Sequence, residues 1–272
     1  MKVVIFCGGL GMRLREYSET IPKPMVPVGS RPILWHLMRY YAHYGHREFI
    51  LCLGYKGDSI KQYFLNYDET VSNDFVMSAG GKQVKLLASD IQDWNITFVD
   101  TGMSSNIGQR LKLVEPFLGR DEAFLANYSD GLSDMPLPAM LDYFDAAPDA
   151  VACFAAVAPV GSFHLVQVGD GGRVQSIRHV KDTGMRVNGG FFAFRRGIFD
   201  YMRDGEELVQ EPFQRLAADG RLLGYSYDGF WACMDTFKEK QLLEDMYAHG
   251  SVPWEVWKSP REVRRLAMAA HA

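Results

Sequence analysis

The sequence predicts an α/β fold built around a mostly parallel sheet. Runs of apolar and β-branched residues alternate with stretches in which apolar residues recur every three or four positions. This alternation is typical of βαβ units, in which a helix covers the sheet between two parallel strands. With 272 residues and a hydrophobic content of 47%, the chain is also long enough to bury a substantial core.

The individual elements follow from local patterns. The chain enters a strand over 2–7 and leaves it at a glycine-rich turn. Residues 32–44 predict a helix, because Pro32 suits a first turn and Gly45 suits a stop. A short strand pair at a sheet edge is expected near 84–88. Further strands are expected over 48–53, 96–99, 123–130, 150–157, 165–168, 174–180 and 187–194. Further helices are expected over 58–67, at 111–117 and from Gln210-Glu211-Pro212 onward.

Composition limits the classes of partner and location. The net charge is −4 and no basic run occurs, so nucleic acid is not expected as a partner. No window approaches the roughly 20 apolar residues of a membrane helix, and no basic and apolar leader precedes the first strand. We therefore expect a cytoplasmic protein without a membrane partner. The cysteines lack the spacing of a zinc site or a disulfide framework and are expected to be buried thiols: Cys7, Cys52, Cys153 and Cys233.

No linker, low-complexity segment or internal repeat divides the chain. We therefore expect a single domain over residues 1–258. The remaining residues, 259–272, are expected to form a surface helix or a disordered tail.

The most informative motif is the glycine-rich turn after the first strand. Gly8, Gly9 and Gly11 permit positive φ angles and let consecutive backbone N–H groups approach a phosphate. Arg13 adds a forked positive charge, and Lys23, bracketed by two prolines, adds a point charge. The spacing fits neither the dinucleotide-binding pattern nor the Walker pattern. Taken alone, the turn is equally consistent with a simple strand-to-helix connection.

Two aspartates follow apolar runs that lie far apart in the sequence. Asp130 ends the predicted strand at 123–130, and Asp235 comes after Phe230-Trp231-Ala232-Cys233-Met234. Ligands of open α/β sheets collect at the carboxyl ends of strands, so Asp130 and the glycine turn are expected to face one crevice. Carboxylate oxygens combined with substrate phosphates suit Mg²⁺. Either aspartate alone is more often a turn or N-cap residue, whereas the pair beside the glycine turn favours a metal site.

Several motifs, in order from the first residue to about Trp257, resemble those of the sugar-phosphate nucleotidyltransferases. They are Gly8-Gly9-Leu10-Gly11-Met12-Arg13-Leu14, Lys23-Pro24-Met25, Asp100-Thr101-Gly102 with Ser104-Ser105 and Arg110-Leu111, Tyr128-Ser129-Asp130-Gly131, Asn188-Gly189-Gly190-Phe191-Phe192, and Phe230-Trp231-Ala232-Cys233-Met234-Asp235-Thr236. Within that family, the pattern is most similar to the cytidylyltransferases that use glucose 1-phosphate. The resemblance implies a Rossmann-like, three-layer α/β/α fold with a mixed, mostly parallel sheet, of the nucleotide-diphospho-sugar transferase type.

The resemblance also implies a reaction. A phosphate oxygen of a sugar 1-phosphate attacks the α-phosphorus of a nucleoside triphosphate, and pyrophosphate leaves. Because the attacking phosphate is already ionised near neutral pH, the protein must neutralise charge rather than supply a base. By resemblance, the catalytic residues are Arg13, Lys23 and Asp130, and the Mg²⁺ ligands are Asp130 and Asp235. Relatives of this kind are usually homo-oligomers and make nucleotide sugars for polysaccharides or glycoconjugates.

The nucleotide-binding residues follow from the same motifs. The base is assigned to Thr101, Ser105 and Arg110, a small polar patch after the strand at 96–99. Without the resemblance this patch reads as a helix entry with a Ser or Asn cap. With it, the pattern favours CTP, and dTTP or UTP on the same fold is the alternative. The triphosphate is assigned to Gly8, Gly9, Leu10, Gly11, Met12, Arg13 and Lys23.

The acceptor side departs from the family pattern. The family's Glu-Lys-Pro segment is His179-Val180-Lys181 here, and its Arg-Phe-Gly segment is Ser162-Phe163-His164. Both His164 and His179 are equally consistent with exposed strand residues. The acceptor is therefore expected to be a sugar 1-phosphate or a different small phosphate or phosphonate. The candidate acceptor-binding residues are His179, Lys181, Asn188, Gly189 and Trp231.

Two other classes of function are weighed against this reading. A CTP-binding regulatory homologue without transfer activity fits the altered acceptor side, but the retained charged residues argue against it. A glycosyltransferase of related architecture would need an Asp-x-Asp motif at a strand end, and Tyr128-Ser129-Asp130 does not supply one.

Overall fold

A seven-stranded sheet forms the centre of the protein in the computed structural model, which describes residues 1–9, 21–161 and 163–258. The strand order is β14-β10-β13-β8-β1-β4-β7. β13 runs antiparallel to both of its neighbours, and the other pairs are parallel, so the predicted mixed, mostly parallel sheet is confirmed. The strands are β1 (Val3–Phe6), β4 (Glu48–Leu53), β7 (Asn95–Asp100), β8 (Ala123–Tyr128), β10 (Ala152–Val157), β13 (Val187–Arg195) and β14 (Leu222–Tyr227).

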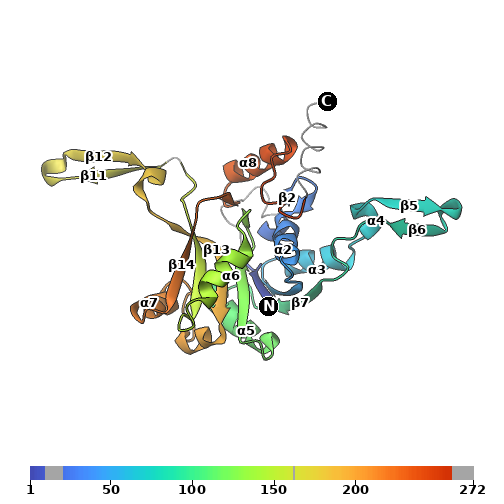
Figure 1. The fold of residues 1–272 in the computed structure, drawn as a ribbon, viewed down its shortest axis with the longest axis horizontal. Coiled ribbons are helices and arrows are strands. Elements are labelled where there is room, and N and C mark those ends of the chain that lie inside the picture. The colour runs from blue at the N-terminus through green and yellow to red at the C-terminus, as the bar shows by residue number, and fades with distance from the viewer. Residues whose placement is uncertain (10–20, 162, 259–272) are drawn as a thin grey trace.

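Helices cover both faces of this sheet, which gives three layers (Figure 1). Alternate residues of β1 show the division, since Val3 and Ile5 pack into one core and Val4 and Phe6 into the other. The first core is closed by α2 (Ile33–His43), α3 (Gly57–Leu65) and α6 (Leu137–Asp145), and the second by α5 (Ile107–Val114) and α7 (Glu211–Ala218). The helices expected at 32–44, 58–67, 111–117 and from Gln210 are thereby confirmed, with residues 115–118 forming a 3₁₀ turn, η4 (Glu115–Leu118).

A smaller third core lies at the carboxyl end of the sheet. Two short pairs of strands frame it, and helix α8 packs against it through the buried Leu243. The elements are β2 (Pro27–Val28) with β3 (Arg31–Pro32), β9 (Gly131–Ser133) with β15 (Trp231–Cys233), the 3₁₀ turn η2 (Lys23–Met25) and α8 (Phe237–Ala248).

Two hairpin arms project from opposite sides of the body (Figure 1). One is β5 (Phe75–Ser78) with β6 (Gln83–Leu86), preceded by the short helix α4 (Glu69–Ser72); the other is β11 (His164–Val168) with β12 (Val174–His179). In each arm the two strands pair only with each other. A strand pair therefore forms where one was expected near 84–88, but its expected position at a sheet edge is wrong, because the pair forms a separate arm.

The remaining expectations concern the tail, the thiols and the membrane. The expected tail at 259–272 lies outside the described residues. Cys7, Cys52 and Cys153 are buried free thiols, and Cys233 is a half-buried one. In the described part of the chain, no helix combines the length and apolar character needed to cross a bilayer.

Candidate active site

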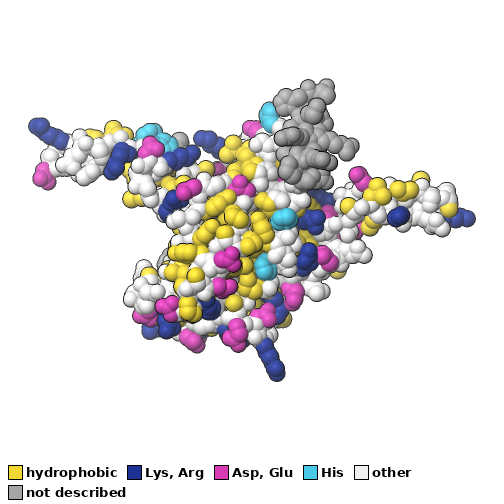
Figure 2. Space-filling view, viewed as in Figure 1, with side chains coloured by type: hydrophobic (Ala, Val, Ile, Leu, Met, Phe, Trp, Pro, Cys, Tyr) yellow, Lys and Arg dark blue, Asp and Glu magenta, His cyan; other side chains and the backbone are white. Residues whose placement is uncertain are grey.

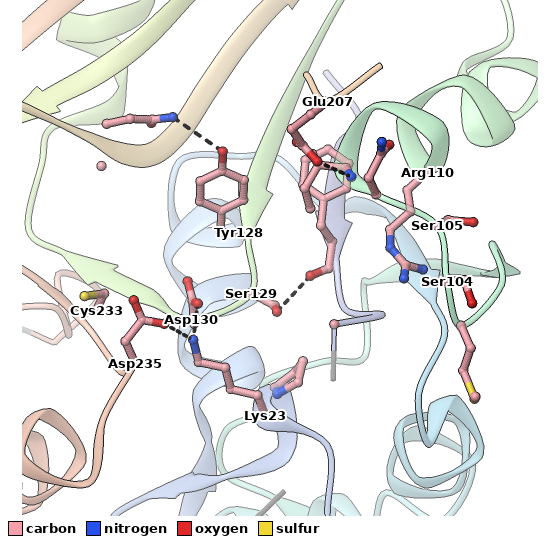
Figure 3. A pocket seen from close by; sticks show the side chains of 18 of the residues that line it. Lys23, Ser104, Ser105, Arg110, Tyr128, Ser129, Asp130, Glu207, Cys233 and Asp235 are labelled. Atoms are coloured by element: carbon pink, nitrogen blue, oxygen red, sulfur yellow. Dashed lines mark hydrogen bonds and ion pairs between the residues drawn. The ribbon is translucent and has the colours of Figure 1, made fainter. Parts of the chain in front are cut away.

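A cleft of about 720 Å³ opens where β1 and β8 end, with Phe6 and Tyr128 in its wall. Figure 3 shows side chains from several elements pointing into it. The predicted residues that line the cleft are Gly9, Lys23, Ser105, Arg110, Asp130, Asn188, Gly189, Trp231 and Asp235.

Asp130 and Asp235 are brought together by the small β9–β15 ladder. Gly131 of β9 pairs with Cys233 of β15, and the Met234 N–H donates to the Asp130 carbonyl at 2.9 Å. These contacts place the residue just before β9 beside the residues just after β15. Two aspartates that are 105 positions apart in the sequence therefore share one corner of the cleft.

Lys23 lies between these two carboxylates. Its Nζ is 2.5 Å from Asp130 Oδ2 and 2.5 Å from Asp235 Oδ1 (Figure 3). The backbone is fixed by η2, where Pro24 is buried and the Met25 N–H donates to the Pro22 carbonyl at 2.8 Å. Burial lowers the pKa of the Lys23 ammonium, but the two carboxylates outweigh this effect and the pKa is raised. Lys23 therefore stays charged.

The donor set of this corner fits a hard divalent cation such as Mg²⁺. Both carboxylates already converge on one positive charge, so their oxygens reach a common point. Within the described residues, no third His, Cys, Asp or Glu completes a protein-only metal cage. Mg²⁺ is commonly bound by one or two carboxylates together with substrate phosphates and water. The corner thus suits an ion that arrives with a phosphate ligand.

The glycine turn has a different physical basis from the expected one. Neither Gly8 nor Gly9 adopts a positive φ, which corrects the expectation for these two residues. A Cβ on Gly8 would lie 2.0 Å from Nη1 of Arg110, so the absent side chain makes room for the guanidinium. A Cβ on Gly9 would meet nothing within 4 Å, and this residue lines the cleft. The predicted Leu10, Gly11, Met12 and Arg13 lie outside the described residues.

Arg110 fastens three strand ends together. Its side chain is 2% exposed, and its Nη1 donates to Leu53 O at 3.1 Å and Gly102 O at 2.9 Å, while Nη2 donates to Gly8 O at 3.0 Å. Thr101 is equally buried; its hydroxyl donates to Leu53 O and accepts from Arg110 Nη1. The Thr101 hydroxyl is therefore engaged by Leu53 and Arg110, and Thr101 does not line the cleft.

The acceptor candidates divide into two groups. Trp231 Nε1 donates to Gly189 O at 2.8 Å, and Asn188 Nδ2 donates to the Tyr128 hydroxyl at 3.4 Å, so these residues form one wall of the cleft. The structure does not place His179 or Lys181 in that wall. They lie at the base of the β11–β12 arm, where the His179 ring packs against that of His164 with centroids 5.2 Å apart.

Tyr128 and Glu207 are among the cleft residues that were not expected from the sequence. Tyr128 ends β8 just before Asp130, and its position in a quoted motif was the available signal. Burial raises the pKa of its hydroxyl, and the negative charge of Glu207 raises it further. Glu207 reaches the cleft from the loop before α7. No motif marks Glu207 in the sequence.

Comparisons with known proteins agree with this architecture. The nucleotidyl transferase family model matches residues 2–246. The chain is 40% identical over 260 residues to glucose-1-phosphate cytidylyltransferase from Salmonella typhi, which covers 95% of this chain and 100% of that protein. It is 38% identical over 259 residues to the probable glucose-1-phosphate cytidylyltransferase from Bacillus subtilis, with 94% and 100% covered. Its fold matches a putative glucose-1-phosphate thymidylyltransferase from Bacillus anthracis with a TM-score of 0.64 at 16% identity, covering 90% and 94% of the two chains. The chain therefore belongs to the nucleotidyl transferase family of enzymes.

Proposed function

We propose that this enzyme is a Mg²⁺-dependent cytidylyltransferase that transfers CMP from CTP to a small phosphorylated acceptor, with glucose 1-phosphate as the first candidate. The observation that carries the proposal is the convergence of Lys23, Asp130 and Asp235 at the carboxyl end of the sheet. The choice of CTP and of a sugar 1-phosphate is supported by the activity named for the relatives from Salmonella typhi and Bacillus subtilis.

In this proposal, the protein acts by holding two anions in line and neutralising their charge. Asp130 and Asp235 would hold Mg²⁺, which would supply Lewis-acid stabilisation of the phosphate oxygens. The Lys23 ammonium faces the same corner and stabilises charge between the acceptor phosphate and the α-phosphate. An acceptor phosphate oxygen forms a bond to the α-phosphorus while the bond to the β-phosphate oxygen breaks, and pyrophosphate leaves. Arg13 is proposed, from the sequence motif, to hold the triphosphate.

The acceptor is proposed to lie against Asn188, Gly189 and Trp231. The Trp231 indole N–H is already bound to the Gly189 carbonyl, so this wall is held in place before a ligand arrives. Participation of His179 and Lys181 gains no support from their position at the base of the arm.

Pyrophosphate release tests the proposal. Each nucleoside triphosphate should be combined with Mg²⁺ and a panel of sugar 1-phosphates and other small phosphate and phosphonate metabolites. Release with CTP and one acceptor would support the proposal. Release only with dTTP or UTP would show that the nucleotide donor is one of these and not CTP. Tight CTP binding without release across the whole panel would identify a regulatory homologue instead.

We further propose that the protein is a homo-oligomer whose arms are covered by other copies. In the β5–β6 arm, Phe75 pairs with Leu86 and Met77 pairs with Val84, so these four residues share one apolar face. Met77 is 63% exposed, and hydrophobic side chains are visible along the arm in Figure 2. An isolated two-stranded hairpin is only marginally stable in water, which favours a covering partner.

Light scattering at several concentrations tests this assembly. Met77→Lys should shift the mass toward the monomer, whereas Gln83→Lys on the opposite face of the same arm should not. A monomeric wild-type protein at all concentrations would contradict the proposal.

The buried free thiols fit a reducing compartment, and we propose the cytoplasm as the location of the protein. We also propose that residues 1–258 form one domain.

A further inference from the structure

Glu207 is a carboxylate at an unexpected place in the cleft. It lies among Ser105, Arg110 and Tyr128, at the end away from Lys23 and its two aspartates (Figure 3). A negative charge in a cleft that receives a triphosphate repels the phosphates, so this end suits a part of the nucleotide that carries hydrogen-bond donors.

The loop that carries Glu207 is fastened to the start of α5 and to α7. Asn106 Nδ2, at the start of α5, donates to Gly205 O at 2.9 Å, and Arg215 Nη1, in α7, donates to Glu206 Oε1 at 2.9 Å. A Cβ on Gly108 would lie 2.3 Å from the Glu206 carbonyl, so α5 and the loop are in direct backbone contact. These contacts hold the two residues before Glu207 in place.

The Glu207 carboxylate is held by two backbone N–H groups. Its Oε2 accepts from the Ile107 N–H at 3.4 Å, in the first turn of α5, and its Oε1 accepts from the Leu208 N–H at 3.1 Å. The positive end of the helix dipole lies at that turn. Each carboxylate oxygen still has a lone pair for a ligand in the cleft.

Cytosine offers the complementary chemistry. Its Watson–Crick edge carries two acceptors, O2 and N3, and one donor, the amino group at C4, whereas uracil and thymine carry an acceptor oxygen at C4. Ser105 and Arg110 line the same end of the cleft, but the Ser105 hydroxyl donates to the Thr101 carbonyl and Arg110 donates to the carbonyls of its floor, so Glu207 is the group here that offers lone pairs to a donor. We propose that Glu207 accepts a hydrogen bond from the amino group of cytosine and thereby selects CTP over UTP and dTTP. This inference rests on the proposed cytidylyl transfer.

Donor selectivity provides the test. kcat/KM should be measured with CTP, UTP and dCTP for the wild type, Glu207→Ala and Glu207→Gln. In Glu207→Ala the CTP-to-UTP ratio should fall about tenfold or more, because a carboxylate no longer favours an amino group over a carbonyl. Glu207→Gln retains an acceptor oxygen and should fall less. The CTP-to-dCTP ratio should stay unchanged, since the ribose is not the group being recognised.

Asp204→Asn is the matched control. Asp204 lies on the same loop, pairs with Lys112 on α5, and is 97% exposed outside the cleft. Its removal should leave the CTP-to-UTP ratio at the wild-type value. A thermal melt of each variant checks that the fold is retained.

Three outcomes would overturn the inference. A changed CTP-to-dCTP ratio with an unchanged CTP-to-UTP ratio would assign Glu207 to the ribose hydroxyls. An equal loss for every donor would assign it to the support of α5. A matching ratio change in Asp204→Asn would show a non-specific charge effect. If the wild type released no pyrophosphate from CTP, the proposed function would fail, and calorimetric binding of CTP and UTP to the same variants would still test Glu207 separately.

Discussion

The two ends of the cleft are built in different ways. At one end, the charged side chains of Lys23, Asp130 and Asp235 form two ion pairs, and each residue lies within a motif that can be recognised in the sequence. At the other end, Arg110 is engaged by backbone carbonyls and Glu207 is presented by a loop docked on a helix. In the proposed function, the charged end would hold the phosphates, which every nucleotide shares, and the packed end would distinguish the base. Catalysis and base recognition would then be separable by mutation.

Removing one of the proposed metal ligands should have the largest effect and would test the charged end directly. Asp130→Asn and Asp235→Asn should each lower kcat by roughly 10³-fold, because a neutral amide binds Mg²⁺ more weakly than a carboxylate and the transferring phosphate would lose the cation that balances its charge. Turnover at a series of Mg²⁺ concentrations measures this loss. Asp228→Asn, at an exposed ion pair with Arg186, should retain wild-type turnover. Full activity in either cleft variant would remove that aspartate from the mechanism.

Replacing the lysine should have the next largest effect. Lys23→Ala should lower turnover by about 10²-fold, as should Arg13→Ala, because a positioned charge is lost. In Lys23→Ala the two aspartates also lose their ammonium partner, so Mg²⁺ binding without nucleotide should tighten. Calorimetry measures that binding, and Lys61→Ala on the exposed face of α3 should change neither quantity. Near-wild-type turnover would show that the charged end works without Lys23.

The third prediction concerns the floor of the cleft, where Arg110 binds the carbonyls at the ends of β1, β4 and β7. Gly8→Ala would force a Cβ against the buried Arg110 guanidinium, so we expect a loss of about 1–3 kcal/mol in folding free energy. This corresponds to a decrease of roughly 5 °C in Tm. Gly9→Ala, where a Cβ meets nothing within 4 Å, should leave Tm unchanged. Equal melting temperatures for the two variants would mean that Arg110 can move aside without loss.

The smallest effect is expected at the acceptor wall. Trp231→Phe removes the hydrogen bond to Gly189 O, and the loss of about 1 kcal/mol should raise the acceptor KM roughly fivefold. The KM for CTP in the same variant is the internal control and should not change. A change in both KM values would show that Trp231 affects the binding of both substrates and not of the acceptor alone.

The sequence was a good guide to the charged end and a poor one to the packed end. Lys23, Asp130 and Asp235 belong to short motifs that can be recognised in the sequence. Asp130 follows β8, and ligands collect at the carboxyl end of such a strand, whereas Lys23 is placed by η2 and Asp235 by the β9–β15 ladder. Glu207 depends on a loop that docks on a helix about 100 residues earlier, and no local pattern encodes such a contact. The side-chain direction of Thr101 likewise depends on tertiary hydrogen bonding.

The fold shows the same division. Apolar periodicity predicted the strands of the central sheet because they are buried on two faces. The arms have the same alternating pattern as a sheet edge, since one face of each hairpin is apolar. Alternation specifies a half-covered strand and does not specify what covers it. The position of the β5–β6 pair therefore required the structure.

The ion pairs of Lys23 would couple the proposed binding of metal and nucleotide. The Lys23 ammonium is the counter-ion of both carboxylates. In the proposed function it would become available to a triphosphate once another cation replaced it between Asp130 and Asp235. Such a cation exchange would make metal binding and nucleotide binding depend on each other. Thermodynamic linkage then requires each ligand to tighten the binding of the other by the same factor. The enzyme would then bind its nucleotide and its metal cooperatively.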